Sequence, residues 1–340
     1  MSEFLEELFT AVSNAKQLLI VPHNDPDPDA IASAVALRYL LTEKKLGLAV
    51  DIAYLGIIGR AENKALVRYL KRPLRHFTAS DHRHSPFMAL VDTQPGTGNN
   101  PLTSTDKASV VIDHHPLRPE TADVPFADVR ANVGSSSTIL TEYLQAAKLT
   151  LPTHIATALF YGIKTDTMGL SRGAGLADAA AYFYLQPQID AKALVEIERA
   201  QVSATYFQSL AGALQAARVN KDAVSAYIGP MQYPDLAAEI ADLLLRLEGV
   251  QWVICLGKYK DHLILAVRSR HRQGGAGSLA LAIIAGEGTA GGHGTMAGGQ
   301  IPLQGAAPAD LAKLLIENGL RYLNIAPETP DISLIQKESG

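Results

Sequence analysis

One short segment of the chain gathers an imidazole and several carboxylates directly after a run of apolar residues. His23, Asp27 and Asp29 follow the apolar run 17–21, and apolar residues at helical spacing continue over 30–41. This predicts a loop at the carboxyl end of a strand, where open α/β sheets bind ligands. Crowded carboxylates repel one another unless a cation neutralises them, and oxygen and imidazole donors suit Mn²⁺, Mg²⁺ or Zn²⁺. An Asp- and Pro-rich turn that caps a helix is the alternative.

Further acidic and imidazole residues follow other apolar runs of the same region. Asp92 comes after the run 88–91, and Asp113 and His114 come after the run 109–112. Asp166 follows a helical stretch that begins near 155. Parallel strands bring their carboxyl ends to one edge of a sheet, so these side chains are expected to meet. The candidate metal ligands are His23, Asp27, Asp29, Asp92, His114 and Asp166. Six ligands exceed the need of one catalytic zinc and fit a two-metal site with a shared carboxylate.

The order of these motifs resembles that of a known family. The matching residues are His23, Asp27, Asp29 and Ala30, then Asp92 and Thr93, then Asp113, His114 and His115, then Thr165, Asp166 and Thr167. In this order they resemble the DHH phosphoesterase family, in the branch of RecJ-like enzymes, nano-RNases, oligoribonucleases and pAp phosphatases. The resemblance implies a manganese- or magnesium-dependent phosphoesterase that acts on short oligonucleotides or small nucleotides.

The resemblance also implies a role for each matched residue. It assigns His23, Asp27 and Asp92 to one metal, and Asp29, Asp92, His114 and Asp166 to the other, so that Asp92 bridges the two ions. Asp113 would not bind a metal itself but would orient an imidazole by a hydrogen bond. His115 would donate a hydrogen bond to a phosphoryl oxygen of the substrate. The alternative for residues 113–115 is a polar strand end that faces solvent.

A glycine-rich segment in the second half resembles a loop of the DHH-associated C-terminal domain. Gly291, Gly292 and His293 belong to this segment, and Arg268 and Arg270 lie upstream on a predicted strand. A backbone cradle for a phosphate or for the base end of the substrate is the functional interpretation, and arginine forks suit phosphates. A flexible turn that needs left-handed backbone angles is the alternative. Family departures are Pro28, Ala290 and Met296, as well as Met168 directly after the Thr-Asp-Thr motif, and none of them removes a metal ligand.

Alternating apolar runs and helical stretches predict an α/β protein of two domains. The N-terminal domain is expected to be a doubly wound, mostly parallel sheet, followed by a smaller C-terminal α/β domain, with the active site in the cleft between them. We expect the catalytic domain at 1–187, a helical connector at 188–218, a substrate-binding domain at 219–328 and a loose tail at 329–340. Within these, a polar stretch with His76, His82 and His84 reads as a surface loop.

Composition limits the classes of partner. A net charge of −4 over 340 residues argues against binding to long duplex DNA, which usually needs a basic face. The single cysteine, Cys255, excludes an intramolecular disulfide and a cysteine-based zinc site. The N-terminus has no basic n-region and no apolar run is long enough to span a bilayer, so a cytoplasmic protein without a membrane partner is expected. A homodimer stays open, because apolar elements in both lobes could form a dimer face.

The resulting main hypothesis is a two-metal phosphoesterase. It would hydrolyse phosphodiester or phosphomonoester bonds in short oligoribonucleotides, linear dinucleotides or adenosine 3′,5′-bisphosphate, with Mn²⁺ as the expected metal and Mg²⁺ as the alternative. Rival hypotheses are a single-strand-specific RecJ-like exonuclease, an inorganic pyrophosphatase and a nucleotide-binding sensor that keeps its metals without turnover.

Overall fold

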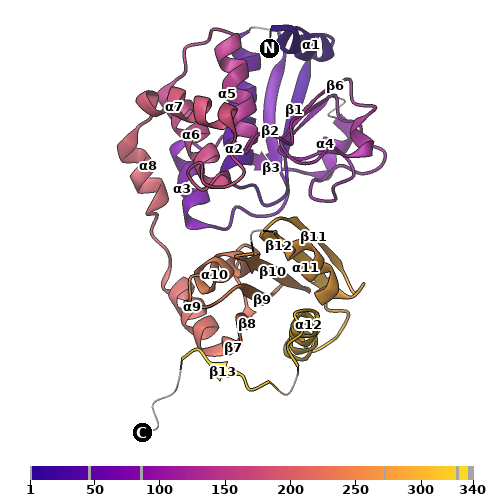
Figure 1. Ribbon diagram of the computed structural model, residues 1–340. Helices are drawn as coiled ribbons and strands as arrows, with labels where there is room; N and C mark the ends of the chain where they lie inside the picture. Colours follow the sequence, from indigo (N-terminus) through magenta and orange to yellow (C-terminus); the bar gives the residue numbers. More distant parts are fainter. Residues whose placement is uncertain (1, 45–46, 85–86, 272, 327–328, 336–340) are drawn as a thin grey trace. The chain divides into compact units, whose positions relative to one another are not determined.

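The chain folds into two units, Met1–Ala200 and Gln201–Gly340 (Figure 1). The computed structural model describes residues 2–44, 47–84, 87–271, 273–326 and 329–335. Within these ranges, none of the helices combines the length and apolar character that crossing a bilayer requires.

Unit 1 contains a sheet of six parallel strands. They are β1 (Gln17–Pro22), β2 (Ala49–Tyr54), β3 (Arg75–His76), β4 (Met88–Val91), β5 (Val110–Asp113) and β6 (Phe126–Val129), in the order β3-β2-β1-β4-β5-β6. The chain builds outward from β1 to β3, then returns to the other side of β1 and builds outward from β4 to β6. The switch point therefore lies between β1 and β4, and in open α/β sheets a ligand binds outside the carboxyl ends of the strands at this point.

The helices of unit 1 are α1 (Ser2–Ala11), α2 (Pro28–Glu43), α3 (Ala61–Tyr69), α4 (Ala79–His84), α5 (Ser136–Ala146), α6 (Thr153–Asp166), α7 (Leu176–Leu185) and α8 (Ala191–Glu198). All of them except α4 contribute to the core on one face of the sheet, whereas His82 of α4 packs against Phe77. The larger core joins α2, α5 and α6 to alternate residues of the strands, such as Leu18, Ile20 and Ile112. The other alternate residues, such as Leu19, Val21 and Val111, form a smaller core with Phe77 on the opposite face. Because both faces are buried, these strands read as continuous apolar runs.

Helix α2 begins inside the segment that carries the first candidate ligands. The Asp27 carboxylate accepts a hydrogen bond from the backbone N–H of Ala30, and Pro28 occupies the first helical turn, where a missing N–H costs nothing. The first ten residues of the helix are all buried. One aspartate therefore both caps the most deeply packed helix of unit 1 and points toward the edge of the sheet.

Unit 2 is a mixed seven-stranded sheet with helices. Its strands are β7 (Arg218–Asn220), β8 (Ala223–Pro230), β9 (Trp252–Tyr259), β10 (His262–Ser269), β11 (Thr289–His293), β12 (Met296–Pro302) and β13 (Ile332–Ser333), in the order β11-β12-β10-β9-β8-β7-β13. Among the described strands of this second sheet, β8 and β9 pair in parallel and all other neighbours pair antiparallel. The helices are α9 (Ala204–Ala216), α10 (Leu236–Leu244), α11 (Ala276–Ile284) and α12 (Pro308–Tyr322), and α11 and α12 form a core with alternate residues of β9 and β10. The α/β architecture predicted from the sequence is confirmed in both units.

The division of the chain differs from the expected domain limits. The predicted connector 188–218 is split, because α8 belongs to unit 1 and α9 belongs to unit 2. Helix α8 contacts α3 and α6, and its buried residues Ala193, Leu194 and Ile197 form its packed face. Part of the expected loose tail is also ordered, since Ile332 and Ser333 pair with β7. Tertiary packing, which composition does not reveal, moves both limits.

The predicted glycine loop is a β-hairpin, which corrects the sequence interpretation. Gly291, Gly292 and His293 lie in β11 and pair antiparallel with Gly298, Ala297 and Met296 of β12. Only Gly294 and Thr295 form the turn, and Gly294 has the positive φ of 56° that a two-residue hairpin turn needs. The glycines allow close packing, since a Cβ on Gly277 of α11 would lie 2.4 Å from the carbonyl oxygen of Gly292. The segment is therefore a paired hairpin and not a flexible turn, and β11 forms the edge of its sheet.

Candidate metal centre

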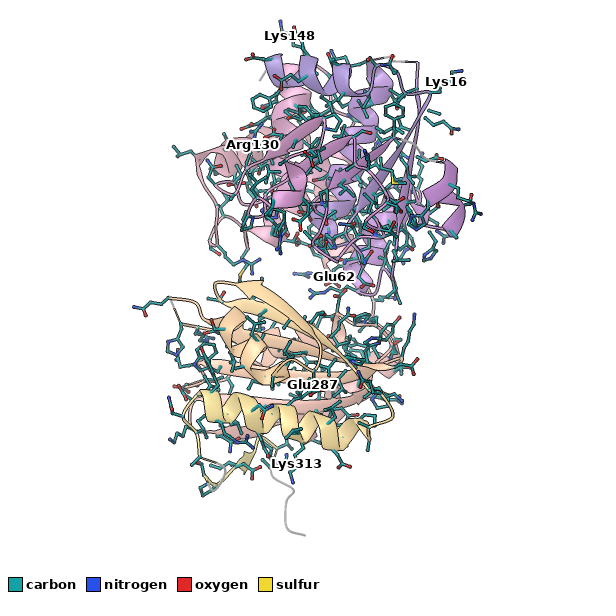
Figure 2. All side chains as sticks on the ribbon, turned by 90° about the vertical axis from the view of Figure 1, so that its right-hand side faces the viewer. Lys16, Glu62, Arg130, Lys148, Glu287 and Lys313 are labelled. Carbon is teal, nitrogen blue, oxygen red and sulfur yellow. The ribbon has the colours of Figure 1, made fainter. Side chains whose placement is uncertain are left out.

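The candidate ligands lie at the carboxyl ends of the central strands of unit 1. His23 follows β1, Asp92 follows β4, His114 follows β5, and Asp166 is the last residue of α6. Figure 2 marks the two ends of the unit: Lys16, just before β1, and Lys148, just after α5, lie at one end, and Glu62, after β2, lies at the other. Because β1, β4 and β5 are neighbours in the sheet, their ends bring these side chains together.

Six predicted ligands and His115 form three overlapping groups. His23, Asp27 and Asp92 form the first; Asp29, His114 and Asp166 the second; Asp92, His114 and His115 the third. Within each group one donor atom from each residue lies within 4.8 Å of the others. Asp92 and His114 each belong to two groups, so they join the groups into one cluster.

The His114 imidazole lies between two carboxylates and donates a hydrogen bond to neither of them. Its Nε2 atom lies 3.4 Å from Oδ1 of Asp92 and 3.3 Å from Oδ2 of Asp166. This nitrogen is buried, and it has no hydrogen-bond partner among the described residues. A buried nitrogen that faces two carboxylate oxygens without bonding either is what a shared cation between them would satisfy.

Asp92 occupies a backbone conformation that few residues adopt. Its φ is +59°, in the left-handed region that aspartate enters more readily than most side chains. Its backbone N–H donates to the carbonyl of Ile112 on the next strand. The carboxylate then lies between two imidazoles: Oδ2 is 3.6 Å from Nε2 of His23, and Oδ1 is 3.4 Å from Nε2 of His114.

Asp29 is fixed by the start of a neighbouring helix. Its Oδ2 accepts the backbone N–H of Ser136 at 2.7 Å, and its Oδ1 accepts that of Ser137 at 2.8 Å. These are the first two residues of α5, whose N-terminus favours a negative charge. Oδ1 also accepts the hydroxyl of Ser33 at 3.5 Å, and the second lone pair of Oδ2 remains for the cluster.

Asp113 and His115 form a separate pair at the edge of the cluster. Oδ1 of Asp113 accepts Nδ1–H of His115 at 2.8 Å and the backbone N–H of His114 at 2.8 Å. Oδ2 accepts the side-chain amide of Gln94 at 2.6 Å. Gln94 is itself fully buried and accepts from Arg118 and Thr121. Asp113 therefore orients the imidazole of His115.

The ionisable groups of the cluster are shifted by burial and by one another. Burial opposes the charged imidazole of His23, but the carboxylates of Asp27 and Asp92 outweigh it and raise its pKa to about 10. Burial and the charges of Asp92 and Asp166 hold the pKa of Asp29 well above its usual range. Burial and Asp27 raise the pKa of Asp166 to about 6. The cluster therefore favours bound positive charge, which protons or divalent cations can supply.

The donor set fits divalent cations of the harder kind. Four carboxylates and two or three imidazoles provide oxygen and nitrogen ligands without a thiolate, a combination that suits Mn²⁺ and Mg²⁺ among the common metals. The unpartnered Nε2 of His114 is the specific atom that such an ion would satisfy.

The two arginines of unit 2 that are predicted to bind substrate differ in their exposure to solvent. Arg268 is only 9% exposed, and its Nε donates to Asp242 of α10, so much of its fork is engaged inside the unit. Arg270 is exposed, and its Nε donates to the carbonyl of Leu245. The side chain of His293, as well as Arg272, lies outside the described residues.

Neither His76 nor His82 of the polar stretch 75–85 joins the cluster. His76 packs against Tyr54, and Nδ1 of His82 lies 2.8 Å from Asp106, while the side chain of His84 lies outside the described part of the chain. The stretch is not only a loop, because it contains β3 and α4.

Two contacts of the cluster were not anticipated from the sequence. Ser136 donates its hydroxyl to Oδ1 of Asp92 at 3.0 Å, and Gln94 donates to Asp113. Serine favours the start of a helix, and Ser135 is the N-cap of α5, which places Ser136 in its first turn. No local pattern marks Gln94, whose role depends on a partner 19 residues away.

A comparison with protein families identifies this part of the chain. The model of the DHH family, N-terminal domain, matches residues 17–163. Residues 17–163 belong to the DHH family. This DHH domain runs from the start of β1 into α6, and Asp166 lies three residues beyond the match.

Two curated proteins show how far the DHH likeness extends. The uncharacterized protein MJ1633 of Methanocaldococcus jannaschii is 34% identical over 308 residues, which are 89% of this chain and 62% of that protein. A probable manganese-dependent inorganic pyrophosphatase of Lactobacillus gasseri is 28% identical over 152 residues, which are 44% of this chain and 47% of that protein. The chain thus spans less than two thirds of either relative.

Solved structures share the fold beyond the DHH domain. An exopolyphosphatase-related protein of Bacteroides fragilis superposes with a TM-score of 0.75 at 14% identity, covering 95% of this chain and 97% of that one. RecJ of Thermus thermophilus, solved with Mn²⁺, gives a TM-score of 0.55 at 14% identity over 94% of this chain and 54% of that one. At such identities the likeness shows a shared two-domain fold.

Proposed function

We propose that the chain is a metal-dependent phosphoesterase that hydrolyses small phosphorylated substrates. The residues that would hold two divalent cations are those of the candidate metal centre, with Mn²⁺ as the main candidate and Mg²⁺ as the alternative. In this scheme His23, Asp27 and Asp92 hold one ion, and Asp29, Asp92, His114 and Asp166 hold the other.

One observation carries the proposal. Asp92 presents one carboxylate oxygen to His23 and the other to His114, while Nε2 of His114 is buried without a hydrogen-bond partner among the described residues. A carboxylate shared between two groups of donors is the arrangement that a two-metal site needs. Membership of the DHH family supports the same chemistry, and so does the name of a relative, a probable manganese-dependent pyrophosphatase.

The bound cations would supply an activated water and neutralise charge on the transferred phosphoryl group. His115 would contribute from the protein side. Its Nδ1–H donates to Asp113, and this bond fixes the ring so that Nε2 can donate to a phosphoryl oxygen when the imidazole is protonated. The nearby carboxylates of Asp113 and Asp92 outweigh burial and raise the pKa of His115, which favours the protonated, donating form.

The substrate class is the finer part of the proposal. We favour short oligoribonucleotides, linear dinucleotides and adenosine 3′,5′-bisphosphate, because a net charge of −4 gives little general attraction for a long polyanion. Arg268, Arg270, Gly291, Gly292 and His293 of unit 2 stay predicted substrate contacts. Of these, Arg270 supports the idea best, because its guanidinium is exposed.

Inorganic pyrophosphate is a second candidate substrate. The likeness to manganese-dependent pyrophosphatases of several bacteria supports it, although each match covers less than half of this chain. The two candidates share their metal chemistry and differ only in the substrate that is bound.

The test is hydrolysis by the purified protein with Mn²⁺. It compares a 5′-labelled RNA dinucleotide, adenosine 3′,5′-bisphosphate, pyrophosphate and a long single-stranded DNA. Turnover of the dinucleotide or bisphosphate with little on the long strand is expected. Preference for the long strand would indicate an exonuclease, preference for pyrophosphate a pyrophosphatase, and bound Mn²⁺ without any turnover a sensor.

A histidine variant tests the role of the protein side chain in the same assay. His115→Gln should lower kcat by about 10²- to 10³-fold, the scale of losing one aligned donor. His82→Gln is the matched control, because His82 pairs with Asp106 outside the cluster, and it should keep wild-type activity. Equal activity of the two variants would remove His115 from the proposal.

A further inference from the structure

Ser136 contacts two of the candidate metal ligands at once. Its hydroxyl donates to Oδ1 of Asp92 at 3.0 Å, and its backbone N–H donates to Oδ2 of Asp29 at 2.7 Å. Asp92 is in the group of His23 and Asp27, and Asp29 is in the group of His114 and Asp166. We propose that Ser136 is a positioning residue of the metal centre, which fixes the shared carboxylate of Asp92 through its hydroxyl. The proposal rests on the two-metal function proposed above.

The Asp92 carboxylate needs a donor of this kind. Its two oxygens face different imidazoles, at 3.6 Å for His23 and 3.4 Å for His114, and neither imidazole holds it by a short hydrogen bond. Rotation about the Cβ–Cγ bond by less than a half turn would tilt the plane of the carboxylate and move both oxygens away from their imidazoles. A hydroxyl that donates to Oδ1 holds this plane and leaves further lone pairs of both oxygens for ions.

The backbone on each side of this contact is fixed. Asp92 has a left-handed φ of +59°, and its N–H is bonded to Ile112. Ser136 is fully buried at the first turn of α5, where Ser135 caps the helix through the N–H of Thr138. The backbone positions of Asp92 and Ser136 are therefore both set by the fold, and so is the distance that the serine hydroxyl has to bridge.

A buried aspartate of another helix secures the loop that carries Ser136. Both oxygens of Asp178 accept the N–H of Gly134 at 2.9 Å, and its Oδ1 accepts the hydroxyl of Thr138 at 2.6 Å. Asp178 itself lies in the first turn of α7, where its Oδ2 accepts the N–H of Gly175. The loop is thus tied down on both sides of Ser136, at Gly134 and at Thr138.

The experiment is Mn²⁺ binding by the full chain, measured by calorimetry and by the electron spin resonance of free Mn²⁺. Ser136→Ala removes the hydroxyl and keeps the backbone N–H on Asp29. It should weaken binding of at least one ion by about 10- to 100-fold, as expected for a partner that orients a ligand. The melting temperature of the metal-free protein checks that the variant is folded.

Thr141→Val is the matched control. Thr141 is equally buried in the same helix, but its hydroxyl donates to the backbone carbonyl of Ser137 and not to a candidate ligand. Its Mn²⁺ affinity should stay within about twofold of wild type, the scatter of an independent site. An unchanged affinity in Ser136→Ala, or an equal loss in both variants, would overturn the inference.

Two further outcomes separate this inference from the proposed function. If the wild type binds no Mn²⁺, the proposed function fails, whereas wild-type binding with an unaffected Ser136→Ala variant overturns only the role of Ser136. If the alanine variant does not fold, Ser136→Thr decides, because it keeps the hydroxyl. Threonine should keep the affinity within about threefold, well inside the loss given for a missing ligand partner, and a larger loss in a folded threonine variant would overturn the proposal.

Discussion

Two of the sites where unit 1 buries carboxylates satisfy them in different ways. Asp178 is fully buried, and the protein satisfies it completely, with the N–H groups of Gly134 and Gly175 and the hydroxyl of Thr138. In the metal centre, Asp92 and Asp166 face Nε2 of His114 at ion-pair distance without a hydrogen bond from it.

The difference teaches which buried charge serves the fold and which serves a ligand. A carboxylate whose neighbours are all donors of the protein itself needs no ligand to satisfy it. A cluster whose donors lie close together but remain unbonded gains stability only when something binds. The following predictions test this contrast, from the largest expected effect to the smallest.

The largest effect should come from the shared ligand. Asp92→Asn removes one charge and keeps the shape of the side chain, so it should lower hydrolysis by at least about 10³-fold, the scale of a lost principal electrostatic stabiliser. The stability of the metal-free protein should change little, because Asp92 repels the carboxylates of Asp29 and Asp166 but attracts the imidazoles of His23 and His114. Mn²⁺ should raise the melting temperature of the wild type and leave that of the variant unchanged. A strongly destabilised metal-free variant would show that Asp92 serves the fold.

The opposite result is expected for Asp178. Asp178→Ala leaves the buried donors of Gly134, Gly175 and Thr138 without their acceptor, which should reduce the free energy of unfolding by about 3 kcal/mol. Urea denaturation of the metal-free protein measures the loss. Asp190→Ala is the control, because Asp190 only caps α8 through the N–H of Ala193 and should lose about 1 kcal/mol. Similar losses in both variants would contradict a special role for the buried carboxylate.

A glycine where α6 meets the cluster should be more sensitive than a glycine elsewhere. A Cβ on Gly162 would lie 2.4 Å from Oγ of Ser137 and 3.1 Å from Cα of Asp29. Gly162→Ala should therefore lose about 1–3 kcal/mol to overpacking and weaken Mn²⁺ binding, because α6 ends at Asp166. Gly212→Ala in α9 is the control: its Cβ would meet nothing within 4 Å, so it should gain about 0.5–1 kcal/mol in thermal unfolding.

The smallest effect should come from a carboxylate satisfied by an arginine near the surface. Both oxygens of Asp81 accept from Arg75, and Thr78 donates to Oδ2, so the pKa of Asp81 falls to about 2. Because the folded pKa lies below the unfolded value near 3.8, its contribution is present above pH 4 and is lost as the pH falls through 2. With solvent screening it amounts to about 1 kcal/mol. Wild type should lose this advantage over Asp81→Asn between pH 5 and pH 2 in urea unfolding, and a constant difference would refute it.

Local patterns predicted much of the fold and of the cluster. Apolar runs marked β1, β4 and β5, and the acidic residue after each run marked the edge of the sheet. Predictions failed where local pattern and packing disagree. The glycines 291–299 suggested a loop, yet they pair as strands because α11 approaches their backbone closely, and the connector was divided because α8 has an apolar face that packs on unit 1.

The sequence by itself determined which donors unit 1 offers, because a buried strand is a continuous apolar run and its carboxyl end is the next polar residue. The tertiary structure alone decided which oxygen of Asp92 faces which imidazole, and which donors fix the carboxylates. Ser136 reaches Asp92 across 44 residues and Asp29 across 107. Such contacts arise from the order of strands in the sheet and from the packing of α5 beside α2, which no local periodicity encodes.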